Sequence, residues 1–78
     1  TLWEKAAVLC EALVNYHVFV DGNKRTALIA TARFLIVNGW ELTATNNAAE
    51  KAIIGIVTKS MNVDSLAQWF KKHSRKVK

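Results

Sequence analysis

The sequence predicts an all-α fold, built as a small helical bundle. Apolar residues recur at spacings of three and four, as they do on the buried face of a helix. The 78 residues include no proline and three glycines, which favours helices joined by short turns. A chain of this length forms one small domain at most. We expect residues 1–70 to form the helical core and residues 71–78 a basic C-terminal tail.

Two helices are predicted in the first half of the chain. Residues 2–15 place Leu2, Ala6 and Leu9 on one stripe of a wide apolar face. Residues 23–37 are apolar nearly all round, which predicts a central helix that is buried on every side. Asn38 and Gly39 then supply a left-handed stop for this second helix.

Two further helices are predicted after a short extended connection over residues 40–44. Thr45, Asn46 and Asn47 are all good N-caps for a third helix that runs to about Met61, and Asn47 with Glu50 resembles a capping box. Gly55 inside this helix suggests that another helix crosses closely there. Asp64 or Ser65 is expected to cap a fourth helix, which Leu66, Trp69 and Phe70 anchor.

Part of this apolar surface is expected to pack on something outside the sequence. A core this small usually needs additional support, and Cys10 is the only cysteine, so an internal disulfide is excluded. Thr1 is not an initiator residue, and Leu2-Trp3 reads as mid-helix. We therefore expect a missing N-terminal part, with Trp3 facing it, or a second copy of the chain in a homo-oligomer.

Charge and hydropathy disfavour two classes of partner. The apolar runs are about six residues long, against the roughly 20 that a membrane span needs, and no signal peptide is visible. A single cysteine among apolar neighbours, expected to be buried, fits a cytoplasmic protein. The net charge of +5 lies wholly in residues 71–78, whereas residues 1–70 are neutral. We therefore expect a solvated helix end there, with His73 in solvent, and consider a nucleic-acid partner unlikely.

One segment, residues 17–25, carries side chains that a simple bundle does not need. Its sequence is His-Val-Phe-Val-Asp-Gly-Asn-Lys-Arg, between two apolar helices. A turn with Gly22 leads into the helix that begins at about Asn23, where the first backbone N–H groups lack partners and the helix dipole favours an anion. Lys24 and Arg25 add two positive charges at this end. The arrangement predicts a phosphate-binding site.

Two more side chains of this segment suit phosphate chemistry. Asp21 offers the oxygen ligand that Mg²⁺ uses when it bridges a carboxylate and phosphate oxygens. The usual pKa of histidine, near 6.5, suits His17 for taking a proton from an attacking hydroxyl at neutral pH. Each residue alone is more often structural, so the prediction depends on all of them falling within one short segment.

The segment resembles the signature of the Fic/Doc family, His-x-Phe-x-Asp/Glu-Ala/Gly-Asn-Gly/Lys-Arg. Fic enzymes, which transfer AMP to hydroxyl side chains, have glycine after the asparagine and a second arginine three residues beyond the first. This chain has Lys24 and Leu28 at those positions, which is similar to the Doc (death on curing) branch. Doc toxins belong to toxin–antitoxin pairs. The resemblance extends over residues 2 to about 70, and the family has a further N-terminal region with a β-hairpin flap.

The resemblance implies an ATP- and Mg²⁺-dependent enzyme with an antitoxin partner. Such an enzyme transfers the γ-phosphate of ATP to a threonine of elongation factor Tu and so arrests growth. His17 would be the general base, Asp21 the magnesium ligand, the backbone of Gly22, Asn23 and Lys24 the anion site, and Lys24 and Arg25 the phosphate contacts. AMP transfer, or a helical interaction module without activity, stays open as an alternative.

Overall fold

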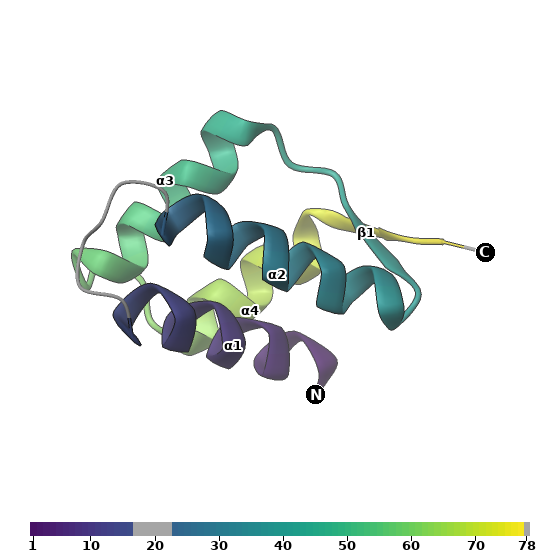
Figure 1. Cartoon of the computed structure of the whole chain (residues 1–78). Helices are drawn as coiled ribbons and strands as arrows, with labels where there is room; N and C mark the ends of the chain where they lie inside the picture. The colour runs from purple at the N-terminus through teal and green to yellow at the C-terminus, as the bar shows by residue number, and fades with distance from the viewer. Residues whose placement is uncertain (17–22, 78) are drawn as a thin grey trace.

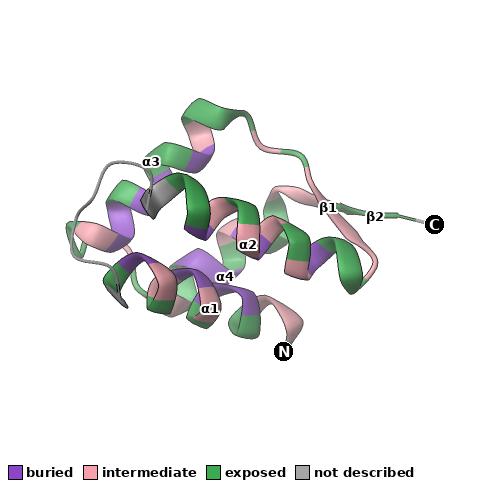
Figure 2. Cartoon of the chain, viewed as in Figure 1, coloured by how far each residue is buried: buried purple, intermediate pink, exposed green. Residues whose placement is uncertain are grey.

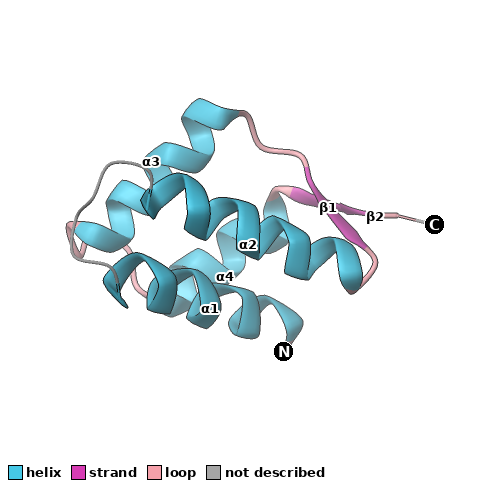
Figure 3. Cartoon of the chain, in the orientation of Figure 1, coloured by secondary structure: helices cyan, strands magenta, loops and turns pink. Residues whose placement is uncertain are grey.

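The computed structural model describes residues 1–16 and 23–77, with the backbone alone at Tyr16, Asn23 and Lys24. This part of the chain forms four helices and two short strands (Figures 1 and 3). In chain order they are α1 (Leu2–Tyr16), α2 (Asn23–Val37), β1 (Trp40–Leu42), α3 (Asn46–Val57), α4 (Val63–Lys72) and β2 (Ser74–Lys76). The predicted small helical bundle is confirmed, and an antiparallel pair of strands is added to it. None of these helices is long and apolar enough to span a bilayer.

The core lies where α1 packs against both α2 and α4, with α3 closing one side (Figure 2). Small residues on α1, namely Ala6, Ala7 and Cys10, are fully buried and allow the other helices to approach closely. The largest fully buried side chains come from the other helices: Leu35, Ile53, Ile56, Leu66 and Phe70. The Thr31 hydroxyl is buried too, and it donates to the Ala27 carbonyl at 2.8 Å. The polar group inside the core is therefore satisfied.

Cys10 is buried, as predicted. Burial raises the pKa of its thiol, and a hydrogen bond with Thr31 offsets part of that shift. The raised pKa keeps the side chain neutral at physiological pH, so Cys10 packs as a small apolar residue.

The prediction that α2 is buried on every side is wrong for this chain. Ile29 is 59% exposed, Ile36 52% and Val37 78%. The other elements cover only the face of α2 that carries Ala27, Thr31 and Leu35 (Figure 2). An apolar stripe of α2 therefore faces outward, because the described helices are too few to surround it.

The start of α3 confirms one of the three predicted N-caps, whereas the capping box and the end of the helix differ from the prediction. Thr45 is the N-cap, with its hydroxyl accepting from the Ala48 N–H at 3.2 Å, so Asn47 lies inside the helix and forms no capping box with Glu50. The helix ends at Val57 rather than near Met61. Its last turn closes by a bond from the Met61 N–H to the Gly55 carbonyl at 3.0 Å.

Met61 also explains why a residue without a side chain occupies position 55. A Cβ at Gly55 would lie 2.9 Å from both Cγ and Sδ of Met61. The close neighbour is therefore the chain's own following turn, and not the crossing helix that was expected.

Asn62 caps α4, two or three residues earlier than predicted. Its side-chain oxygen accepts from the Ser65 N–H at 2.8 Å, so Asp64 and Ser65 both lie within the first turn. The prediction of Asp64 or Ser65 as the cap is wrong, since a residue two positions upstream already fills that role.

The basic C-terminal residues do not simply extend a helix. Lys71 and Lys72 form the last turn of α4, as expected, but the chain then turns and Ser74–Lys76 pairs with Trp40–Leu42. The Arg75 Nε donates to Glu41 Oε1 across this pair at 2.7 Å. The turn into β1 uses Gly39 at φ 87°, which confirms the left-handed stop predicted after α2.

Two aromatic contacts were not predicted from the sequence. Trp3 packs edge-on against Trp40, with 4.9 Å between the ring centroids, so it contacts β1 within this chain. His73 stacks on Trp69 at 4.4 Å, and its Nδ1 lies 2.9 Å from the Trp69 carbonyl oxygen. The expectation that His73 is solvated is therefore wrong, because its ring is partly buried against Trp69 at the end of α4.

Candidate functional site

The predicted site lies between two helix ends that share one end of the bundle (Figure 1). α1 ends at Tyr16 and α2 begins at Asn23. His17, Asp21 and Gly22 belong to the intervening residues and lie outside the part of the chain that the structure describes. Asn23, Lys24 and Arg25 form the first turn of α2.

The first turn of α2 is the part of the helix where the sequence predicts anion binding. N–H groups in the first turn of any helix have no carbonyl partner within that helix, and the helix dipole makes this end positive. The first turn of α2 contains no acidic residue that would offset this potential. Its Lys24 and Arg25 add formal positive charge. The start of α2 therefore carries a positive potential.

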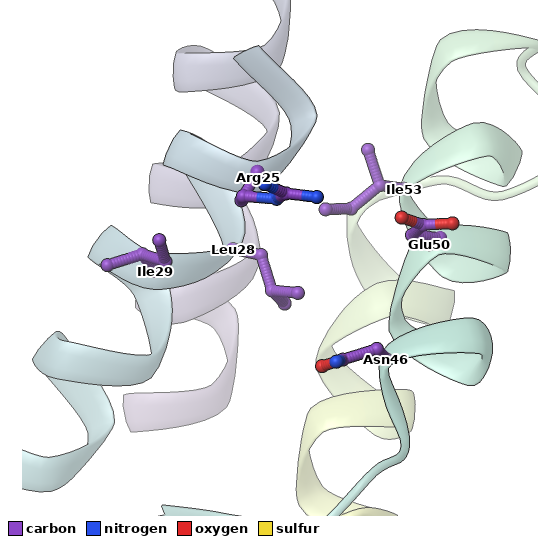
Figure 4. A pocket seen from close by; sticks show the side chains of 6 residues that line it. All are labelled: Arg25, Leu28, Ile29, Asn46, Glu50 and Ile53. Carbon is purple, nitrogen blue, oxygen red and sulfur yellow. The ribbon is translucent and has the colours of Figure 1, made fainter. Parts of the chain in front are cut away.

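Arg25 is the predicted site residue whose side chain the structure describes. It is exposed and lies at the mouth of a cavity of about 270 Å³ between α2 and α3 (Figure 4). Leu28 and Ile29 of α2 line the cavity with it, and α3 contributes Asn46, Glu50 and Ile53.

The cavity has polar groups around an apolar floor. The Arg25 side chain extends from α2 toward α3, and the Glu50 carboxylate lies on the facing wall (Figure 4). Ile53 is only 2% exposed, because its side chain belongs to the core. Arg25 and Glu50 form none of the ion pairs found among residues 1–16 and 23–77.

Within residues 1–16 and 23–77, His, Cys, Asp and Glu side chains form no cluster of three that could hold a metal ion. The predicted magnesium ligand, Asp21, lies outside those residues.

Sequence reasoning did not assign Glu50 or Asn46 to the site. It treated both as parts of a helix cap, yet they face Arg25 across the cavity. Their spacing shows only that they share one face of α3. Asn46, Glu50 and Ile53 follow one another at intervals of four and three on α3, just as Arg25, Leu28 and Ile29 share one face of α2. Which face of α3 meets α2 is a tertiary property, however, and no local pattern reveals it.

Comparison with known proteins matches residues 1–35 to the Fic/DOC family. This region includes all of α1, residues 17–22 and most of α2. The chain is also similar to Toxin Doc of Mycolicibacterium smegmatis (strain ATCC 700084 / mc(2)155), with 43% identity over 68 residues. The match covers 85% of this chain and 52% of that toxin, so the chain spans about half the length of the curated relative.

Proposed function

Since the chain belongs to the Fic/Doc family, we propose that the complete protein is a Doc-type toxin that phosphorylates a translation factor. It transfers the γ-phosphate of ATP to a hydroxyl side chain of a protein similar to elongation factor Tu, and an antitoxin partner restrains it. The observation that carries this proposal is the Asp-Gly-Asn-Lys-Arg sequence at residues 21–25, at the start of a helix whose first turn attracts anions.

In this proposal, His17 and residues 21–25 each have a role in the reaction. His17 takes the proton from the attacking hydroxyl. The N–H groups of Gly22, Asn23 and Lys24 bind phosphate oxygens, and the side chains of Lys24 and Arg25 neutralise their charge. Asp21 would hold Mg²⁺, which supplies further charge neutralisation at the phosphates. Phosphoryl transfer depends mostly on such positioning and charge stabilisation.

Two positions favour γ-phosphate transfer over AMP transfer. Lys24 replaces the glycine of Fic enzymes, and we expect its longer, charged side chain to exclude one phosphate from that position. Leu28 replaces their second arginine, and in this structure it presents an apolar side chain to the cavity beside Arg25. Both changes favour a reversed nucleotide, with its γ-phosphate at His17.

Labelled ATP tests this proposal. The complete protein would be incubated with cell extract and with ATP labelled at either the α- or the γ-phosphate. We expect a protein target to be labelled from γ-labelled ATP alone. Labelling from α-labelled ATP would show AMP transfer and contradict the argument from Lys24. With folding confirmed, absence of labelling from either nucleotide would favour a helical interaction module.

The Lys24→Gly variant is the companion measurement. Glycine reopens the space that lysine fills, so part of the labelling should shift toward the α-phosphate. The same lysine-to-glycine change at Lys51 does not serve as the control. Glycine in the middle of α3 costs about 1 kcal/mol of helix stability. Lys24→Ala is the matched control, because it removes the charge while keeping a side chain.

A further inference from the structure

The cavity between α2 and α3 is too small for a whole nucleotide. Its volume of about 270 Å³ lies just below the range of roughly 300–1,000 Å³ in which proteins bind drug-sized molecules. A single ring with its substituents fits that space. The cavity is therefore suited to one part of a larger ligand whose remainder lies outside it.

The two charged walls of the cavity limit what that part is. Arg25 attracts an anionic group at the side nearest the start of α2, whereas Glu50 on α3 repels one. A carboxylate accepts hydrogen bonds through two oxygens and donates none. The Glu50 wall therefore suits a neutral group that carries hydrogen-bond donors, ideally two adjacent ones.

The apolar floor restricts the ligand further. Leu28, Ile29 and Ile53 offer only carbon atoms to the space between the charged groups. A sugar ring presents C–H groups on one face and hydroxyls at its edge, so it satisfies the floor and the Glu50 wall together. A ribose joined to a phosphate also places its anionic end toward Arg25.

Glu50 is held in place by the packing of α3. Ala49, Ala52 and Ile53 on this helix are buried, and the Thr45 cap fixes where the helix begins. The Glu50 side chain itself stays exposed. The position of Glu50 on the cavity wall is therefore fixed by its backbone, and its carboxylate faces solvent where a ligand can reach it.

We propose that this cavity binds the ribose of the nucleotide, with the Glu50 carboxylate accepting hydrogen bonds from the 2′- and 3′-hydroxyls. Glu50 is then the residue that selects ribonucleotides over deoxyribonucleotides. This inference depends on the proposed function, because it places the phosphates of the same nucleotide at the start of α2.

The test compares the affinity of the complete protein for ATP and for 2′-deoxy-ATP. Hydrogen bonds to a charged group are strong, so ATP should bind about tenfold more tightly. In Glu50→Gln this ratio should fall toward one. Loss of the Glu50 charge also removes its repulsion of the phosphates, which raises the affinity for both nucleotides equally. The ratio of the two affinities cancels this effect and reports on the hydroxyl contact alone.

Glu41→Gln is the matched control. It makes the same chemical change at a carboxylate that pairs with Arg75 across the two strands. This variant should therefore keep the wild-type ratio. Circular dichroism would confirm that both variants are folded.

The possible outcomes distinguish a failure of the ribose assignment from a failure of the proposed function. If the wild type binds ATP and 2′-deoxy-ATP equally, or if Glu50→Gln keeps the preference, the ribose assignment is wrong while the proposed function stands. If Glu50→Gln instead loses discrimination between ATP and ITP, the base occupies the cavity and the assignment is also wrong. Absence of any ATP binding by the wild type would overturn both.

Discussion

The complete protein with His17 replaced by alanine should transfer phosphate about 10²- to 10⁴-fold more slowly than the wild type. Loss of a general base raises the barrier of the chemical step and leaves the phosphate contacts of Lys24 and Arg25 in place. The affinity for ATP should therefore stay nearly unchanged. Transfer would be measured as label incorporated from γ-labelled ATP, and affinity by calorimetric titration.

His73→Ala provides the comparison for this variant. His73 is the other histidine of the chain, and it stacks on Trp69 away from the start of α2. Provided that the variant folds, transfer should continue at the wild-type rate. A His17→Ala protein that keeps full activity in the assay, or full toxicity in cells, would remove His17 from its assigned role.

Phe70→Ala should unfold the domain or bring it close to unfolding. Phe70 on α4 is 1% exposed and belongs to the buried core, and α4 as a whole packs mainly against α1. Replacing a buried phenylalanine by alanine costs about 3–5 kcal/mol, because contacts are lost and a cavity remains. Small domains are stable by only about 5–15 kcal/mol, so this is a large share of the total. Urea denaturation would measure the difference in free energy of unfolding.

Gln68→Ala on the same helix is the control for that measurement. Gln68 is exposed, so its truncation should change the free energy of unfolding by less than about 0.5 kcal/mol. A loss below about 1 kcal/mol for Phe70→Ala would show that the α1–α4 contact contributes little to the core.

Structural features that depend on neighbouring residues in the chain could be predicted from the sequence. Helical spacing located all four helices, and the residue pair Asn38-Gly39 located the left-handed turn after α2. Helix ends were less predictable, since several good caps compete. Thr45 and Asn62 cap α3 and α4, although Asn47, Asp64 and Ser65 are equally suitable residue types.

Features that depend on distant residues were missed. The strand pairing joins residues about 35 positions apart, and three-residue strands carry almost no periodic signal. The contacts of Trp3 with Trp40 and of His73 with Trp69 follow from that pairing. The α3 side of the cavity was missed for the same reason. Glu50 and Arg25 line one cavity only because α3 packs beside α2.

A crystal structure of the complete protein with Mg²⁺ and a non-hydrolysable ATP analogue tests the central claim most directly. That claim is that the start of α2 binds the phosphates of a nucleotide. We expect the triphosphate to lie against the first-turn N–H groups of α2, in contact with Lys24 and Arg25. An analogue bound instead at the basic end of the chain, along Lys71–Lys76, would contradict it.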